Sequence, residues 1–163
     1  MTLVENFKQN TYLGYLAILR IFVGYHFLNS AWNKLSRDHF LQGHSLSTRL
    51  LGPVANDPNA WHQAFIQGFV LHHSLFFSYL IPLGEVAIGV SFVLGCLVRL
   101  SSPFAAFLNL NILFAIAIPA GGAQVGLNRI FIVLDLMFLF SSAGLALGLD
   151  AILKKWFPRS WLF

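Results

Sequence analysis

Three ionisable side chains lie inside long apolar stretches of the sequence. Arg20 lies in the first stretch, Glu85 in the second and Asp135 in the last. A charge in the hydrocarbon of a membrane costs at least about 2.5 kcal/mol unless the group pairs, protonates or reaches water. These three residues are therefore the candidate catalytic residues, and we expect the fold to bring them together as a polar core.

The pair most directly implied by position is Arg20 and Glu85. Each lies near the middle of its apolar stretch, so two antiparallel helices with a rise of ~1.5 Å per residue would place both near mid-depth. We predict that they pair directly or through one polar bridge. Two interpretations stay open: a structural ion pair that fixes the helix register, or a site for a polar head group or a proton-coupled carrier such as a quinone.

Five polar residues are candidates for cofactor binding, with quinone as the one candidate cofactor. They are His26, His72, His73, Asn109 and Asn111. The histidines are expected toward one side of the membrane, where they would line a cavity that reaches down to Glu85 and carries protons. The two asparagines are two residues apart and so point to different sides of their helix. The histidines are also consistent with interfacial polar residues, and the alternative to these is a wet vestibule, or a haem or metal site.

The composition is that of a membrane protein. Of the 163 residues, 57% are hydrophobic and 10% are charged, whereas soluble domains average about 25% charged residues. The chain is therefore expected to be an integral membrane protein surrounded by lipid. Its basic residues are scattered, which argues against a nucleic-acid partner. The single cysteine, Cys96, excludes dithiol chemistry and cysteine-rich metal sites within the chain, and no metal ligands are assigned.

Four stretches are long and apolar enough to cross a bilayer. They are residues 11–31, 74–98, 101–119 and 127–147. The expected fold is all-α: a single domain over residues 1–163, folded as a four-helix transmembrane bundle. In the fourth helix, Asn128 and Asp135 are seven residues apart and should share one face.

The connection between the first two spans has a pattern of its own. Asp57-Pro58 is typical of a helix N-cap followed by proline at the first helical position. Trp61, Phe65 and Phe69 then recur every four residues. This spacing predicts an amphipathic helix between helices 1 and 2 that lies on the membrane surface or caps the mouth of the bundle.

The distribution of lysine and arginine outside the spans favours both termini on the cytoplasmic side. The inner side would carry Lys8, Arg99, Lys154, Lys155 and Arg159, and the outer side Lys34, Arg37 and Arg49. The expected location is a bacterial or archaeal cytoplasmic membrane, or an internal energy-converting membrane.

Several motifs together resemble the DoxX/DoxD family. They are residues 19–24 with 32–34, residues 84–89 followed by 94–99, and the ending at 148–150. The long first connection, with residues 50–53, is more similar to the DoxD branch. The resemblance implies a four-helix membrane protein. In the DoxD branch it implies the small subunit of thiosulfate:quinone oxidoreductase, which oxidises thiosulfate to tetrathionate and passes the electrons to quinone.

The function expected from this resemblance is that of an integral membrane subunit of an oxidoreductase or electron-transfer complex near the quinone pool, bound to other membrane subunits. The alternative is a non-catalytic accessory subunit of a larger respiratory or photosynthetic complex. Leu145 stands where the family often has an arginine, which keeps this alternative close. A carrier for a small amphiphile ranks third.

Overall fold

The computed structural model describes residues 11–36, 41 and 44–162, and within these ranges every regular element is helical. The elements are α2 (Thr11–Ser36), α3 (His44–Val54), α4 (Ala60–Phe65), the π-helical η2 (Ile66–Val70), α5 (Ser74–Leu94), α6 (Val98–Ile112), the π-helical η3 (Leu113–Ala117), α7 (Ile118–Ala120), α8 (Ala123–Phe140) and α9 (Asp150–Trp156). The all-α prediction is confirmed for this part of the chain.

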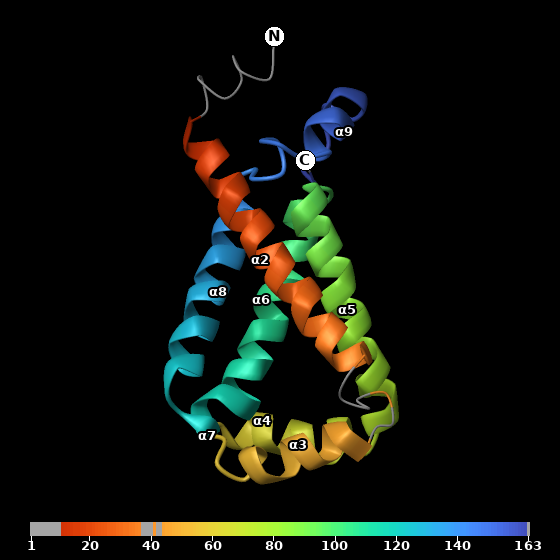
Figure 1. Cartoon of the computed structure of the whole chain (residues 1–163), viewed down its shortest axis with the longest axis vertical. Helices are drawn as coiled ribbons and strands as arrows, with labels where there is room; N and C mark the ends of the chain where they lie inside the picture. The colour runs from red at the N-terminus through yellow and green to blue at the C-terminus, as the bar shows by residue number, and fades with distance from the viewer. Residues whose placement is uncertain (1–10, 37–40, 42–43, 163) are drawn as a thin grey trace.

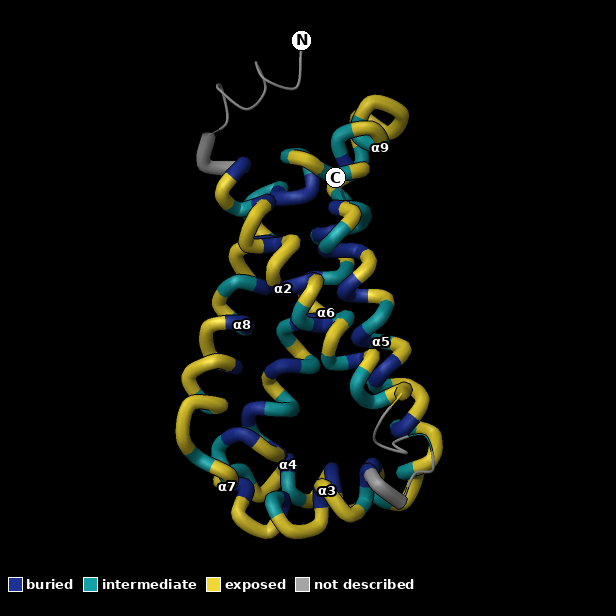
Figure 2. The backbone as a smooth tube through the Cα atoms, in the orientation of Figure 1, coloured by how far each residue is buried: buried dark blue, intermediate teal, exposed yellow. Residues whose placement is uncertain are grey.

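The long helices run along the long axis of the molecule. α2, α5, α6 and α8 lie beside one another, α3 and α4 cross one end, and α9 lies at the other end (Figure 1). Among the described residues, three helices are long and apolar enough to cross a membrane: α5, α8, and the continuous run Val98–Ala120 that α6, η3 and α7 form. Their outer faces are exposed and their inner faces buried (Figure 2).

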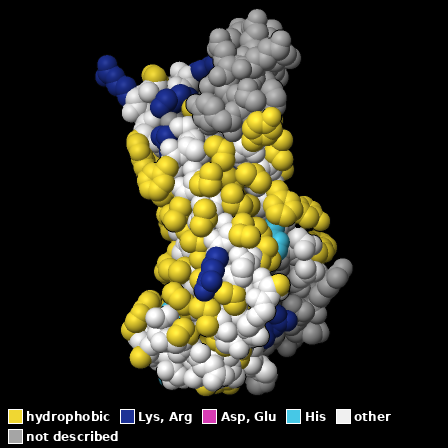
Figure 3. Space-filling model, turned by 90° about the vertical axis from the view of Figure 1, so that its left-hand side faces the viewer, with side chains coloured by type: hydrophobic (Ala, Val, Ile, Leu, Met, Phe, Trp, Pro, Cys, Tyr) yellow, Lys and Arg dark blue, Asp and Glu magenta, His cyan; other side chains and the backbone are white. Residues whose placement is uncertain are grey.

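Apolar side chains cover the outside of these helices. Large hydrophobic residues are exposed on every one of them, for example Phe76 on α5, Phe104 on α6 and Ile130 on α8. Figure 3 shows such side chains along one face of the molecule. Because lipid is the solvent in which such a surface is stable, the chain is a membrane protein, as the composition predicted.

The contact between α2 and α5 is close because glycines lie at the crossing. A Cβ atom on Gly24 would lie 2.9 Å from Phe92 Cβ and 2.9 Å from Val93 N. A Cβ atom on Gly89 would lie 2.7 Å from Leu28 Cγ. The two backbones therefore approach to a distance that only glycine allows, and this crossing fixes which residues of the two helices face each other.

Two helix ends differ most from the prediction. The first helix extends to Ser36, five residues beyond the expected end at residue 31. The last span ends at Phe140 rather than at residue 147. Ser142 and Leu147 have φ values of 47° and 50°, so the backbone from residue 141 to 149 leaves the helical path and exposes carbonyl groups.

The connection between α2 and α5 is largely helical. α4 and η2 cover residues 60–70, close to the predicted amphipathic stretch. Trp61, Phe65 and Phe69 lie on its exposed side, whereas Ile66 and Val70 pack with α3 and η3 in a small apolar cluster. The segment therefore presents two different faces, one buried and one aromatic and exposed.

Candidate functional site

The predicted pairing of Arg20 with Glu85 is wrong. Arg20 is fully buried and donates to the backbone: Nη1 lies 2.6 Å from Ala143 O, and Nη2 lies 3.1 Å from Leu147 O. Glu85 instead contacts Ser30 of α2. Ser30 is ten residues from Arg20, or ~15 Å along the helix axis. The prediction assumed that residues in the middle of two antiparallel stretches lie opposite each other. It failed because the glycine crossing, and not the positions of the helix ends, sets the register of α2 against α5.

Arg20 holds the irregular segment after α8 against α2. The carbonyls it contacts are free because residues 141–149 are not helical. Beside it, Asp150 accepts hydrogen bonds from Leu97 N at 2.6 Å and Val98 N at 3.1 Å. Leu97 directly precedes α6 and Val98 is its first residue, so the Asp150 carboxylate satisfies backbone amides at the start of that helix. Arg20 and Asp150 thus fix one end of the molecule.

The pKa of the Asp150 carboxyl is raised above its ordinary value. Burial raises the pKa most, and it outweighs the opposing effects of the hydrogen bonds from Leu97 and Val98 and of the positive charges of Arg20 and Arg99. Burial therefore governs the titration of this carboxyl.

Glu85 has a cation partner within α2. Lys34 Nζ lies 2.5 Å from Glu85 Oε1, and Ser30 Oγ donates to the same oxygen at 3.1 Å. Lys34 Nζ also donates to Ser30 Oγ at 2.8 Å. The side chain of Glu85 is 1% exposed and that of Lys34 is 17% exposed. The signal that points to Lys34 is its i, i+4 spacing from Ser30, which puts both on one face of the helix.

Asp135 is buried and bound by one of the two candidate asparagines. Asn109 Nδ2 donates to Asp135 Oδ2 at 2.8 Å. The other carboxyl oxygen, Oδ1, is buried without a hydrogen-bond partner among the described residues. Asn128 is buried on the same face of α8, as its spacing from Asp135 predicted. The expected polar core of Arg20, Glu85 and Asp135 is thus divided among three separate contacts.

The three candidate histidines differ in burial and in their contacts. His26 is half-buried, with its ring 4.6 Å from the ring of Phe131. His72 and His73 are exposed, and His73 Nδ1 lies 3.0 Å from Phe69 O. No group of three or more His, Cys, Asp or Glu side chains suited to a metal ion is present in the described part of the chain.

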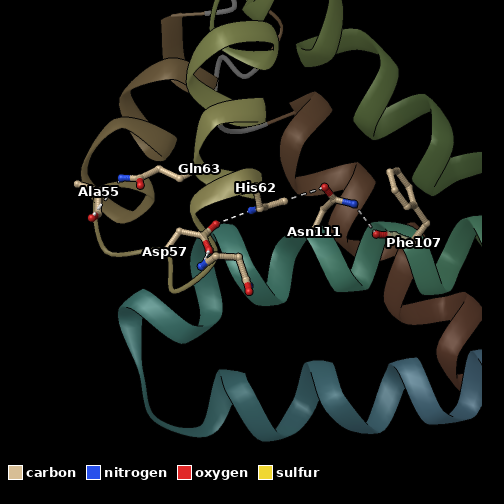
Figure 4. Close-up of polar contacts among 7 residues, drawn as sticks. Ala55, Asp57, His62, Gln63, Phe107 and Asn111 are labelled. Carbon is tan, nitrogen blue, oxygen red and sulfur yellow. Dashed lines mark hydrogen bonds and ion pairs between the residues drawn. The ribbon is translucent and has the colours of Figure 1, made fainter.

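A histidine outside the predicted set lies in a buried polar contact. His62 of α4 is buried, and its Nδ1 contacts Asp57 Oδ2 in the turn after α3. Its Nε2 lies 3.2 Å from Oδ1 of Asn111, which is 49 residues away on α6 (Figure 4). Asn111 Nδ2 in turn donates to Phe107 O at 2.7 Å. The side chains of Asp57, His62 and Asn111 thus form a hydrogen-bonded row. Of the predicted cofactor-binding residues, Asn111 is the one that belongs to this row.

Asp57 does not cap α4 as predicted. The N-cap is Asn59, without a side-chain hydrogen bond. Asp57 Oδ1 accepts from Asn59 N at 2.8 Å, while its Oδ2 contacts His62. The carboxylate therefore holds the turn before α4 and orients the imidazole at the same time. His62 was hard to single out in the sequence because its partners come from two other segments.

A groove of about 220 Å³ opens beside His62 and Asn111. Its lining comprises Trp61, His62, Phe65, Phe107, Leu110, Asn111 and Phe114. The walls are therefore aromatic and apolar, with the imidazole and the amide as the polar groups. A second, shallow hollow of about 440 Å³ follows the outer face of α8. Neither of these two hollows is lined by Glu85, so the cavity expected to reach that residue stays a prediction.

Comparison with known families now adds to this geometry. The DoxX family model matches residues 15–118, more than half of the chain. The chain belongs to the DoxX family. No curated protein and no solved structure matches it.

The family match covers the aromatic groove of this DoxX protein. Asp57, His62 and Asn111 lie within the matched residues, and so do Arg20 and Glu85. Asp135 lies outside the match. In chemical terms, His62 is a proton donor or acceptor oriented by a carboxylate, next to a flat apolar recess.

Proposed function

We propose that this DoxX protein is an integral membrane subunit of an oxidoreductase or electron-transfer complex and binds a quinone head group in the groove beside His62. One observation carries the proposal: the row Asp57–His62–Asn111 ends at an aromatic groove on a chain of apolar helices. A quinone ring needs flat apolar walls and a donor for its carbonyl oxygen. Its reduction also takes up protons, which an oriented imidazole can supply.

The size of the groove supports a ring rather than a whole quinone molecule. Sites for drug-sized ligands occupy roughly 300–1,000 Å³, whereas this groove measures about 220 Å³. The exposed rings of Trp61 and Phe107 flank it. In this proposal the head group enters the groove and the isoprenoid tail stays in the surrounding lipid.

The proposal places four helices across the membrane, with α2 as the fourth span. α2 has 26 residues, or ~39 Å at helical rise, enough for a ~30 Å hydrocarbon core. Its two charges are internally compensated, because Arg20 is bound by carbonyls and Lys34 by Glu85. Contacts of this kind make a charged helix acceptable in lipid.

In the same arrangement, α3, α4 and η2 form a cover at the exoplasmic surface. Trp61, Phe65 and Phe69 would face the head-group region, where aromatic rings are favoured. The termini would lie on the cytoplasmic side. Partner membrane subunits would supply the electrons, with thiosulfate as the candidate donor that the DoxD resemblance implies.

The test is quinone binding by the purified protein in lipid nanodiscs. Titration with decylubiquinone and with a short-chain menaquinone should show saturable binding in the wild type. His62→Leu should weaken binding at least tenfold, because it removes the hydrogen bond to the ring oxygen. His72→Leu is the matched control, since His72 is exposed and outside the groove, and it should bind like the wild type. No saturable binding by the wild type would refute the proposal.

The accessory-subunit alternative has one observation in its favour. Arg20 and Glu85, two of the three ionisable residues in the apolar stretches, are both buried in internal contacts that hold helices and loops together. Charges in such contacts stabilise the fold of this subunit. Extraction of the native complex in mild detergent distinguishes the two readings. Quinone turnover that persists in the complex after His62→Leu favours the accessory role, and loss of turnover favours the quinone site.

A further inference from the structure

The hydrogen positions in the row Asp57–His62–Asn111 follow from the acceptor at its end. One side-chain atom of Asn111 lies 2.7 Å from the carbonyl oxygen of Phe107. A carbonyl oxygen can only accept, so this atom is the amide nitrogen, and the amide oxygen faces the other way. It lies 3.2 Å from His62 Nε2. Asn111 thus presents an acceptor to the imidazole.

This orientation determines where His62 carries hydrogen. Because Nε2 faces an acceptor, it must bear a hydrogen. Nδ1 faces a carboxylate oxygen of Asp57, so a hydrogen must also lie between those two atoms. Imidazole is the stronger base of the two groups in water. The other carboxylate oxygen already accepts from Asn59 N at 2.8 Å, which stabilises the anion. Both ring nitrogens of His62 are therefore N–H donors.

The charge balance agrees with this assignment. The side chains of His62 and Asp57 are 2% and 0% exposed. The neighbours that other elements place against the imidazole are Asn111 from α6 and the ring of Phe114 from η3, 5.7 Å away, which carry no charge. An imidazolium beside a carboxylate is neutral as a pair. A neutral imidazole there would leave a buried negative charge without a counter-ion among the described groups, which is costly.

We propose that the Asp57–His62 pair stores one transferable proton and delivers it from His62 Nε2 to an oxygen atom of a ligand in the groove. This deepens the proposed function, on which the identity of the ligand rests, whereas the proton assignment rests on the hydrogen bonds alone. The ligand class is a flat ring that carries an acceptor oxygen, which takes the place of the Asn111 amide oxygen as partner of Nε2.

In the transfer step one bond breaks and one bond forms. The His62 Nε2–H bond breaks, a ligand O–H bond forms, and the electron pair of the broken bond stays on Nε2. His62 keeps its second hydrogen on Nδ1, facing Asp57. While the ligand stays, its new O–H donates to the bare Nε2. Once the ligand has left, Nε2 needs another donor, which Asn111 supplies only if its amide turns and releases Phe107 O. Asn111 is thus a positioning residue whose orientation follows the protonation of His62.

The experiment is nitrogen-15 NMR of histidine-labelled protein in nanodiscs at pH 8, without ligand. The signals of His62 are identified by their loss in His62→Gln. We expect both ring nitrogens of His62 to give the signal of a protonated nitrogen. In Asp57→Asn, the signal of protonated Nδ1 should be lost, because the counter-charge is gone. A bare Nε2 in the wild type would overturn the proposal.

Two further outcomes separate this inference from the proposed function. Decylubiquinone that binds while Nε2 is bare contradicts the stored proton but leaves the quinone site standing. Two protonated nitrogens with no quinone binding leave the stored proton standing and contradict the quinone site. Should Asp57→Asn fail to fold, Asn111→Leu gives the second readout. Without the acceptor that requires a hydrogen on Nε2, the signal of protonated Nε2 at pH 8 should be weaker than in the wild type.

Discussion

Lys34 of α2 and Glu85 of α5 form an ion pair in which Nζ lies 2.5 Å from Oε1. The glycine crossing of Gly24 and Gly89 on the same two helices sets the register that makes this contact possible. Because Glu85 is buried, it depends on Lys34 and Ser30 for compensation. The ion pair and the crossing together define how the first half of the chain is assembled, and both can be tested by substitution.

Breaking the ion pair from one side should be more harmful than removing it. Glu85→Leu and Lys34→Met are each expected to lower the free energy of unfolding by about 3 kcal/mol, since each leaves an uncompensated charge. The double variant should lose much less than the sum, because no charge is left without a partner. A double-mutant cycle of reversible unfolding in detergent measures the coupling. Additive losses would show that the two residues act independently.

The glycine crossing predicts a difference between two neighbouring glycines of α5. Gly89→Ala should destabilise the protein by about 1–3 kcal/mol, because the new methyl group would lie 2.7 Å from Leu28 Cγ and 2.9 Å from Gly24 O. Gly84→Ala is the matched control, since a Cβ atom there meets nothing within 4 Å. It should be neutral or slightly stabilising. Equal melting temperatures for the two variants would contradict a close crossing.

Arg20 should be irreplaceable by lysine. Its two terminal nitrogens contact the carbonyls of Ala143 and Leu147 in different directions, which one ammonium group cannot reproduce. Arg20→Lys is expected to cost about 2–3 kcal/mol and to increase amide hydrogen exchange in residues 141–149. The conservative change at an exposed arginine, Arg129→Lys, serves as the control. Unchanged exchange in that segment would mean that other contacts hold it.

Asp150 should make stability depend on pH in a defined direction. Burial raises its pKa in the folded protein, so the folded state binds the proton more tightly than the unfolded chain, whose aspartates titrate near pH ~3.9. Its contribution is therefore present below about pH 4 and is lost as the pH rises through the folded pKa. Melting temperatures from pH 4 to 8 should fall more steeply for the wild type than for Asp150→Asn. Parallel curves would exclude Asp150 as the source.

Several features of this protein could be predicted from its sequence. Low charge and long apolar stretches required a membrane protein, and the motifs around residues 19–24 and 84–89 indicated the DoxX family. The cost of an unpaired charge in lipid also required partners for Arg20 and Glu85. The spacing of Asn109 and Asn111 correctly separated their roles, since one contacts Asp135 and the other His62.

Only the tertiary structure decided which partners these are. The register of α2 against α5 depends on how closely two glycines let the backbones approach. In this register Glu85 pairs with Lys34, and Arg20 donates hydrogen bonds to the carbonyls after α8. His62 meets Asn111 across 49 residues because α4 folds over the end of α6. Periodicity along one helix reports which residues share a face. It holds no information on the residue of another helix that the face will meet, because packing between helices sets that contact.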